Sequence, residues 1–124
     1  MKTILILGLS GALGTLARYS LSGLVYRIFG SRFPYGTMAV NLLGCLVLGF
    51  LAALAEVRLS LTPQARLFLM IGFCGAFTTF STLIYESFNL IRDGQTVSAF
   101  LNLMVTVILG FMLFRVGMLI GEVI

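Results

Sequence analysis

The charged residues of this 124-residue chain are so sparse that they divide it into long uncharged runs. Only 10% of the residues are charged, and 60% are hydrophobic, which is not the composition of an ordinary water-soluble domain. Uncharged runs of 23, 19 and 21 residues follow Arg32, Arg66 and Asp93. A helix of about 20 apolar residues is long enough to cross a bilayer. We therefore expect these three runs to be membrane-spanning helices.

The first uncharged run is shorter, with 15 residues between Lys2 and Arg18. It reaches spanning length if Arg18 is included and the helix continues to about Tyr26. A charged interruption followed by more apolar residues does not fit a cleavable signal peptide. The sequence therefore predicts one all-α integral membrane domain, residues 1–124, with four transmembrane helices. Their expected ranges are 3–26, 36–55, 63–91 and 96–120.

The third predicted helix contains a segment that lipid would not favour. The helix is expected to begin at Pro63, because Thr62 and Pro63 are typical of an N-cap and a first helical residue. Residues 72–82 read GFCGAFTTFST, and four of the last five carry hydroxyls. Backbone that leaves the helix in hydrocarbon must line a cavity or bind something, because an unpaired N–H or C=O is costly there. The alternative is an unbroken helix whose hydroxyls bond to the preceding turn. The density of hydroxyls favours a break in mid-membrane, near residues 75–79.

The basic residues of the predicted termini and loops divide equally between the two faces of the membrane. One face carries Lys2, Arg58 and Arg66, and the other carries Arg27, Arg32 and Arg92. Orientation in the membrane is set by an excess of positive charge on the cytoplasmic side. Without an excess, we expect both orientations to insert and to pair as an antiparallel, twofold-symmetric homodimer. The glycines of the first helix (Gly8, Gly11, Gly14) favour close packing against a neighbouring helix.

The polar residues expected at membrane depth are hydrogen-bond donors rather than carboxylates. They are Arg18, Asn41, Thr78, Thr79, Ser81, Thr82, Asn102 and Thr106. The chain has no His, and Cys45 and Cys74 lack metal-ligand spacing, so both are interpreted as small packing residues. An enzyme would need a nucleophile–base pair or a metal cluster, so no enzyme is expected. The basic residues are dispersed singly, which gives no support to nucleic-acid binding.

A route lined by donors favours the passage of a small anion, whereas proton relays and cation-coupled exporters usually need a central Asp or Glu. The Asn41 amide has two N–H donors suited to a desolvated anion, although a membrane Asn is more often an interhelical contact. The electropositive ring edge of Phe80 can also coordinate an anion. Arg18 either snorkels to the interface or attracts anions to an aqueous vestibule. Asn102 and Thr106, one turn apart with Gly110 next, are either interhelical contacts or a pore wall.

Three motifs together resemble the Fluc (CrcB) family of fluoride channels. They are GALG followed by Arg18-Tyr19, YGTMAVN at 35–41, and GFCGAFTTFST at 72–82 followed by Glu86. The resemblance covers essentially the whole chain. It implies an antiparallel dual-topology dimer with two fluoride pores in the cell (inner) membrane. It also implies passive export: HF enters from acid surroundings and dissociates in the cytoplasm, and the trapped anion leaves down its gradient.

The same resemblance implies roles for individual residues. Asn41 and Phe80 would contact fluoride in the pore, and Arg18 would lie at a vestibule. Further candidates for the pore are the hydroxyl residues Thr79, Ser81, Thr82 and Thr106. A structural Na⁺ at the dimer interface would be bound by the backbone carbonyls of Gly75 and Thr78.

The chain departs from the family pattern at three positions. Leu83 replaces a second Phe, Gly110 stands where a hydroxyl residue is common, and Ala76 replaces the second Gly of a Gly-Gly pair. These departures affect the expected rate and second anion site rather than the fold, and they leave pairing with a paralogue as an alternative to the homodimer. Two other functions are compatible with a four-helix membrane protein of this size. A small multidrug-resistance-type proton-coupled exporter needs a membrane-embedded Glu in the first helix, which is absent here. A structural membrane scaffold would not require the hydroxyl cluster.

Overall fold

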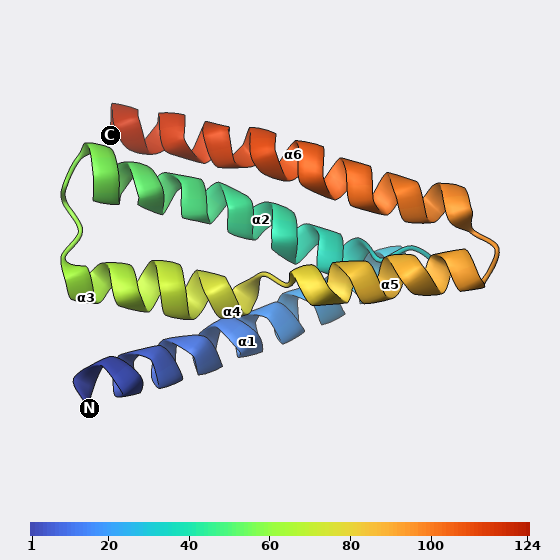
Figure 1. Cartoon of the computed structure of the whole chain (residues 1–124), viewed down its shortest axis with the longest axis horizontal. Helices are drawn as coiled ribbons and strands as arrows, with labels where there is room; N and C mark the ends of the chain where they lie inside the picture. The colour runs from blue at the N-terminus through green and yellow to red at the C-terminus, as the bar shows by residue number, and fades with distance from the viewer.

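The computed structural model describes every residue from Met1 to Ile124, and its regular structure is entirely helical (Figure 1). Four helical segments are long and apolar enough to cross a membrane, which confirms that part of the prediction. They are Lys2–Phe29, Tyr35–Val57, Pro63–Arg92 and Thr96–Val123. Because the number of spans is even, the two termini lie at the same end of the bundle (Figure 1).

The first and last spans are single α-helices, and the two middle spans are segmented. The first is α1 (Lys2–Phe29), and the last is α6 (Thr96–Val123). The second consists of α2 (Tyr35–Ala52) and a π-helical end, η1 (Ala53–Val57). The third consists of α3 (Pro63–Arg66), the π-helix η2 (Leu67–Cys74), α4 (Gly75–Phe77) and α5 (Phe80–Arg92).

The third span begins with the cap that the sequence predicts. The hydroxyl of Thr62 accepts a hydrogen bond from the backbone N–H of Ala65 at 3.2 Å, and Pro63 is the first helical residue. This confirms the predicted N-cap. Arg66, at the end of α3, donates to the carbonyl of Ala55 in η1. The end of the second span and the start of the third are therefore joined directly by a side chain as well as by the loop.

Glycines bring the helices into backbone contact at two interfaces. α2 makes its most extensive contact with α6, and a Cβ added to Gly49 or Gly117 would clash with the backbone of the facing helix. α1 packs on η2 in the same way, because a Cβ on Gly14 would clash with the carbonyl of Phe73. Small residues at helix interfaces allow this close approach in membranes. Gly8 and Gly11, in contrast, meet nothing within 4 Å of an added Cβ, so the face of α1 that carries them has no partner within the chain.

Large apolar side chains cover the outer surface of the bundle. Ile71 is 63% exposed, Phe100 61% and Phe111 79%. A water-soluble domain of this size would bury such side chains, but in a bilayer they face lipid of similar polarity. The few fully buried side chains include polar ones, among them Asn102 and Ser10. The core therefore relies on polar contacts between helices together with close backbone packing.

Candidate functional site

The helical backbone of the third span is interrupted between α4 and α5 (Figure 1). Thr78 has φ −87° and ψ 155°, and Thr79 has φ −151° and ψ 107°, so both residues are extended. α5 begins with Phe80 immediately afterwards. Extended residues cannot make the backbone hydrogen bonds of a helix, so the neighbouring N–H and C=O groups need other partners.

Two backbone N–H groups of the interruption are bonded by side chains. In a continuous α-helix, Thr79 would donate to the carbonyl of Gly75, and Thr82 would donate to the carbonyl of Thr78. Here the Thr79 N–H donates to Oδ1 of Asn41 at 2.7 Å. The Thr82 N–H donates to the hydroxyl of Thr79 at 3.3 Å. The carbonyls of Gly75 and Thr78 are thus left without their helical donors, and these are the two carbonyls that the family resemblance assigns to Na⁺.

The Asn41 side chain holds the interruption in place from α2. Its amide N–H donates to the carbonyl of Thr79 at 3.1 Å, while its carbonyl accepts the Thr79 N–H. Asn41 is only 8% exposed. Since a side-chain amide has two N–H donors, one of them is not used in this pair. Asn41 is therefore an interhelical contact and still has a donor for a ligand.

The hydroxyls of the Thr-Thr-Phe-Ser-Thr motif have different surroundings. The Thr79 hydroxyl caps α5 and also donates to the hydroxyl of Thr82 at 2.8 Å. The Thr78 hydroxyl donates to the carbonyl of Cys74 at 3.1 Å, which is the bond to the preceding turn that the unbroken-helix alternative predicts. Ser81 is exposed, and its side chain makes no hydrogen bond. The motif thus caps a helix and supports an extended segment.

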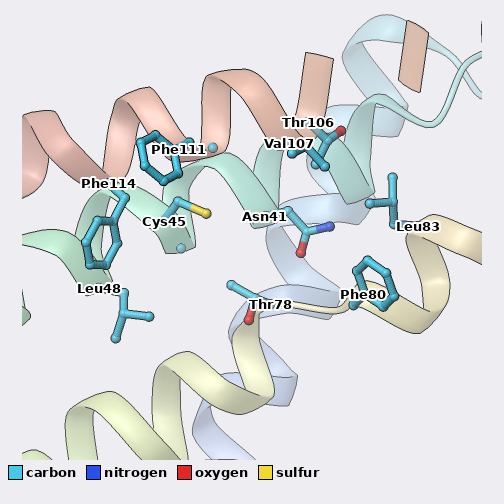
Figure 2. Close-up of a pocket in the computed structure, with 12 residues that line it drawn as sticks. Asn41, Cys45, Leu48, Thr78, Phe80, Leu83, Thr106, Val107, Phe111 and Phe114 are labelled. Carbon is cyan, nitrogen blue, oxygen red and sulfur yellow. The ribbon is translucent and has the colours of Figure 1, made fainter. Parts of the chain in front are cut away.

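A groove of about 390 Å³ lies between α2, α6 and the interruption (Figure 2). Four of the predicted site residues line it, namely Asn41, Thr78, Phe80 and Thr106. No charged side chain lines the groove. Thr106 is 7% exposed, and its buried hydroxyl has no hydrogen-bond partner. The groove therefore combines an apolar wall with an amide and hydroxyls that can donate.

Arg18 and Thr82, which are also predicted at the site, lie outside the groove. Arg18 is half-buried on α1, and its Nε is buried without a partner. Thr82 reaches the site only through its bonds to Thr79. Leu83, at the position where the family commonly has a second Phe, is buried and lines the groove as an aliphatic side chain. Asn102 donates to the Ser87 hydroxyl at 2.9 Å, so it is an interhelical contact between α6 and α5.

Sequence reasoning missed a polar cluster around Glu86. The Thr37 hydroxyl donates to Oε1 of Glu86 at 2.7 Å, and the Tyr26 hydroxyl donates to Oε2 at 3.4 Å. These three residues join α1, α2 and α5. Tyr26 and Glu86 also line a second, more polar cavity of about 380 Å³ with Arg32 and Asp93. The only sequence feature that could have indicated this cluster is the position of Thr37, one helical turn before Asn41 on α2.

A family model described as CrcB-like protein, Camphor Resistance (CrcB), matches residues 5–118. The chain belongs to the CrcB family. The match includes both halves of the interrupted span and the whole groove. It confirms the family resemblance that the three motifs indicated.

Curated relatives of the chain are similar over most or all of its length. A protein of Nitratidesulfovibrio vulgaris, named fluoride-specific ion channel FluC, is 47% identical over 124 residues, which is 100% of both chains. A protein of the same name from Solidesulfovibrio magneticus is 47% identical over 118 residues, covering 95% of this chain and 94% of its own. Another, from Geobacter sp. strain M21, is 45% identical over 108 residues, or 87% of each chain. With four spanning helices and this CrcB membership, the chain is a multi-pass protein of the cell membrane.

Proposed function

We propose that this protein is a fluoride-selective ion channel that lets cytoplasmic fluoride leave the cell passively, down its electrochemical gradient. The observation that carries the proposal is the groove of Figure 2, where an amide and hydroxyls line a passage with no carboxylate. Fluoride is small and strongly hydrated, so it needs donors that replace its water. Full-length relatives named fluoride-specific ion channel support the choice of this anion. A channel moves its ion without chemistry, so this protein is not an enzyme.

Three residues of the groove are proposed to contact fluoride directly. The unused N–H of Asn41 and the unpartnered hydroxyl of Thr106 donate to fluoride as it sheds water. Phe80 is 73% exposed and presents its ring at the start of α5, where its electropositive edge can meet the anion. Conduction requires sites that bind well enough to admit the ion and weakly enough to release it. A few donors in an apolar wall meet that requirement better than a charged site.

The remaining pore candidates act at the edges of the groove. Thr79 and Thr82 are bonded to each other, so they shape the interruption that places Phe80. The exposed Ser81 hydroxyl is free for the side of the pore that faces a second chain. Arg18 has a buried Nε without a partner, which suits a vestibule where an anion approaches.

The groove is open along one side, so the proposed pore needs a second chain to close it. Phe80 and Phe111, which both line the groove, are 73% and 79% exposed. Gly8 and Gly11 leave α1 open to a close helix contact with that chain. We infer a homodimer with two grooves and hence two pores. Equal numbers of basic residues on the two faces favour an antiparallel arrangement.

In this dimer, the interruption lies in mid-membrane and binds a structural Na⁺. The residues present fit such an ion, because the carbonyls of Gly75 and Thr78 have lost their helical donors and hydrocarbon offers no replacement. Gly75 is exposed, so its carbonyl is available to an interface. Bound Na⁺ would supply a positive charge that compensates the carbonyl dipoles of both chains.

Fluoride efflux from liposomes tests the proposed function. Purified protein is reconstituted into liposomes loaded with potassium fluoride, and release is recorded with a fluoride electrode after valinomycin is added. We expect fast fluoride release and no comparable release from chloride-loaded liposomes. A multidrug exporter would instead take up a lipophilic cation when a proton gradient is imposed. A scaffold would do neither, and either of these two results would overturn the proposal.

A further inference from the structure

Cys45 lies on α2 one helical turn after Asn41 and faces Gly110 on α6. A Cβ added to Gly110 would be 3.2 Å from the Cys45 sulfur, which is closer than most real side-chain contacts. The thiol therefore occupies the space in front of Gly110. Figure 2 shows the Cys45 sulfur directed into the space between α2 and α6, on the side of Asn41.

Cys45 belongs to the same groove as the donors already described. The groove is lined in turn by Asn41 with Thr106 and, one helical turn further along both helices, by Cys45 with Gly110. The buried hydroxyl of Thr106 has no partner within the chain. Beyond it, the lining residues are Leu48, Val107, Phe111 and Phe114, which are all apolar. The thiol is thus the only polar side-chain group in that part of the groove.

We propose that the Cys45 thiol contacts fluoride in the permeation path and continues the row of donors from Asn41 and Thr106. This inference rests on the proposed channel function. The thiol supplies a donor from α2 at a level of the groove where α6 contributes only Gly110. An S–H group is a weak donor. A weak donor next to an apolar stretch releases the ion readily, as conduction requires.

Cys74 is the matched control within the chain. It is also a free thiol, but it is only 2% exposed and lies on η2. The cavity that it lines, about 250 Å³ between α1, α2 and the third span, is bounded only by hydrophobic residues. Replacement of this side chain removes a buried thiol of the same size without touching the groove. A general effect of losing a cysteine would therefore appear in both variants.

The first test compares fluoride efflux from liposomes that contain wild type, Cys45→Ala, Cys45→Ser and Cys74→Ala. Loss of one hydrogen bond to the ion in Cys45→Ala should slow efflux about fivefold. Cys45→Ser keeps a donor at the same place and should stay close to the wild-type rate, as should Cys74→Ala. If Cys45→Ala conducts as fast as wild type, the inference is overturned while the channel function stands. If wild type itself releases no fluoride, the proposed function fails and the inference fails with it.

The second test moves the donor across the groove. Cys45→Ala vacates the space that a side chain at position 110 would otherwise share with the sulfur. The double variant Cys45→Ala/Gly110→Ser should therefore recover most of the efflux lost in Cys45→Ala. A double variant no faster than Cys45→Ala would overturn the inference, because a donor at this place would then not matter. Elution volume in detergent shows that each variant has assembled.

Chemical modification tests the same point on protein that has already folded. In the Cys74→Ala background, ethyl methanethiosulfonate is added to the liposomes. The Cys45 thiolate attacks the reagent, forms a mixed disulfide and releases methanesulfinate, which adds an ethylthio group inside the groove. We expect efflux to stop, dithiothreitol to restore it, and Cys45→Ser protein to be unaffected. A mass shift on Cys45 without slower efflux, or no reaction at all, would contradict a thiol in the ion path.

Discussion

The side-chain amide of Asn41 and the main chain of Thr79, 38 positions apart, exchange two hydrogen bonds of 2.7 and 3.1 Å. The bond from the Thr79 N–H replaces the helical bond that this group would make to the carbonyl of Gly75. The residue proposed to donate to fluoride therefore also fixes the segment that carries Phe80. Because anion binding and the interruption of the third span depend on the same amide, replacement of Asn41 should affect both fluoride flux and stability.

Replacement of Asn41 should stop fluoride flux and also weaken the fold. In Asn41→Ala, the buried N–H of Thr79 loses its acceptor, at a cost of about 1–3 kcal/mol. In Asn41→Asp, the acceptor remains, but a carboxylate stands in the anion path. We expect no fluoride efflux from either variant and a lower melting temperature for Asn41→Ala. Leu43→Ala, on α2 outside this groove, is the control. Unchanged efflux in Asn41→Ala would remove Asn41 from the path.

The Thr79 hydroxyl should be needed for the start of α5. It accepts the backbone N–H of Thr82 as an N-cap, and loss of such a cap costs about 1 kcal/mol. Thr79→Val keeps the shape of the side chain and removes the cap, so we expect lower thermal stability and slower efflux. Thr79→Ser keeps the hydroxyl and should behave like wild type in both measurements. Equal stability of the valine and serine variants would show that the cap is dispensable.

Na⁺ should stabilise the assembled protein. A ligand that binds only the folded state raises stability with its concentration, by about 2.7 kcal/mol at one hundred times its Kd. We expect the melting temperature in detergent to rise when N-methylglucamine is replaced by Na⁺ at constant ionic strength. Gly75→Ala is informative here, because no atom of the chain lies within 4 Å of the added Cβ. A smaller rise in melting temperature with Na⁺ in this variant would place the ion near Gly75. If wild type melts at the same temperature in both salts, the proposed Na⁺ site is contradicted.

The hydrogen bond from Thr37 to Glu86 should stabilise the contact of α2 with α5. The two groups are 2.7 Å apart, and a hydrogen bond to a charged group contributes about 1.5–3 kcal/mol. Thr37→Val removes this donor without changing the shape of the side chain and should lower the melting temperature. Thr37→Ser should restore it. If the valine variant melts like wild type, Tyr26 alone suffices as a partner for the carboxylate.

Both orientations of the chain should be found in one membrane. Single cysteines at Ser31 and Ser60, in loops at opposite ends of the bundle, are introduced into a Cys45→Ser/Cys74→Ala background. An impermeant thiol reagent applied to intact cells should label about half of each variant, because the basic residues do not favour one orientation. Addition of two lysines next to Ser60 should shift the labelling towards a single orientation and abolish efflux. Full labelling of one site and none of the other would contradict dual topology.

The segmentation into four spans could be predicted because it depends on local sequence. Charged residues such as Arg32 and Glu56 bound apolar runs, and the cost of burying a charge in hydrocarbon is a property of each residue, whatever its neighbours. The cap at Thr62 was predictable for the same reason, since its acceptor and donor lie three residues apart. Hydroxyls in an apolar run likewise indicated an unusual backbone near Thr79.

Only the tertiary structure decided which polar groups meet. Asn41 bonds to Thr79 across 38 positions, Thr37 to Glu86 across 49, and the Cys45 thiol faces Gly110 on another helix. These contacts depend on how closely and at what rotation the helices pack, which glycines such as Gly49 and Gly117 make possible. The sequence alone determined which segments of the chain can span a membrane. The pairing of donors and acceptors across helices depended on packing, because hydrogen bonds need positions correct to within tenths of an ångström.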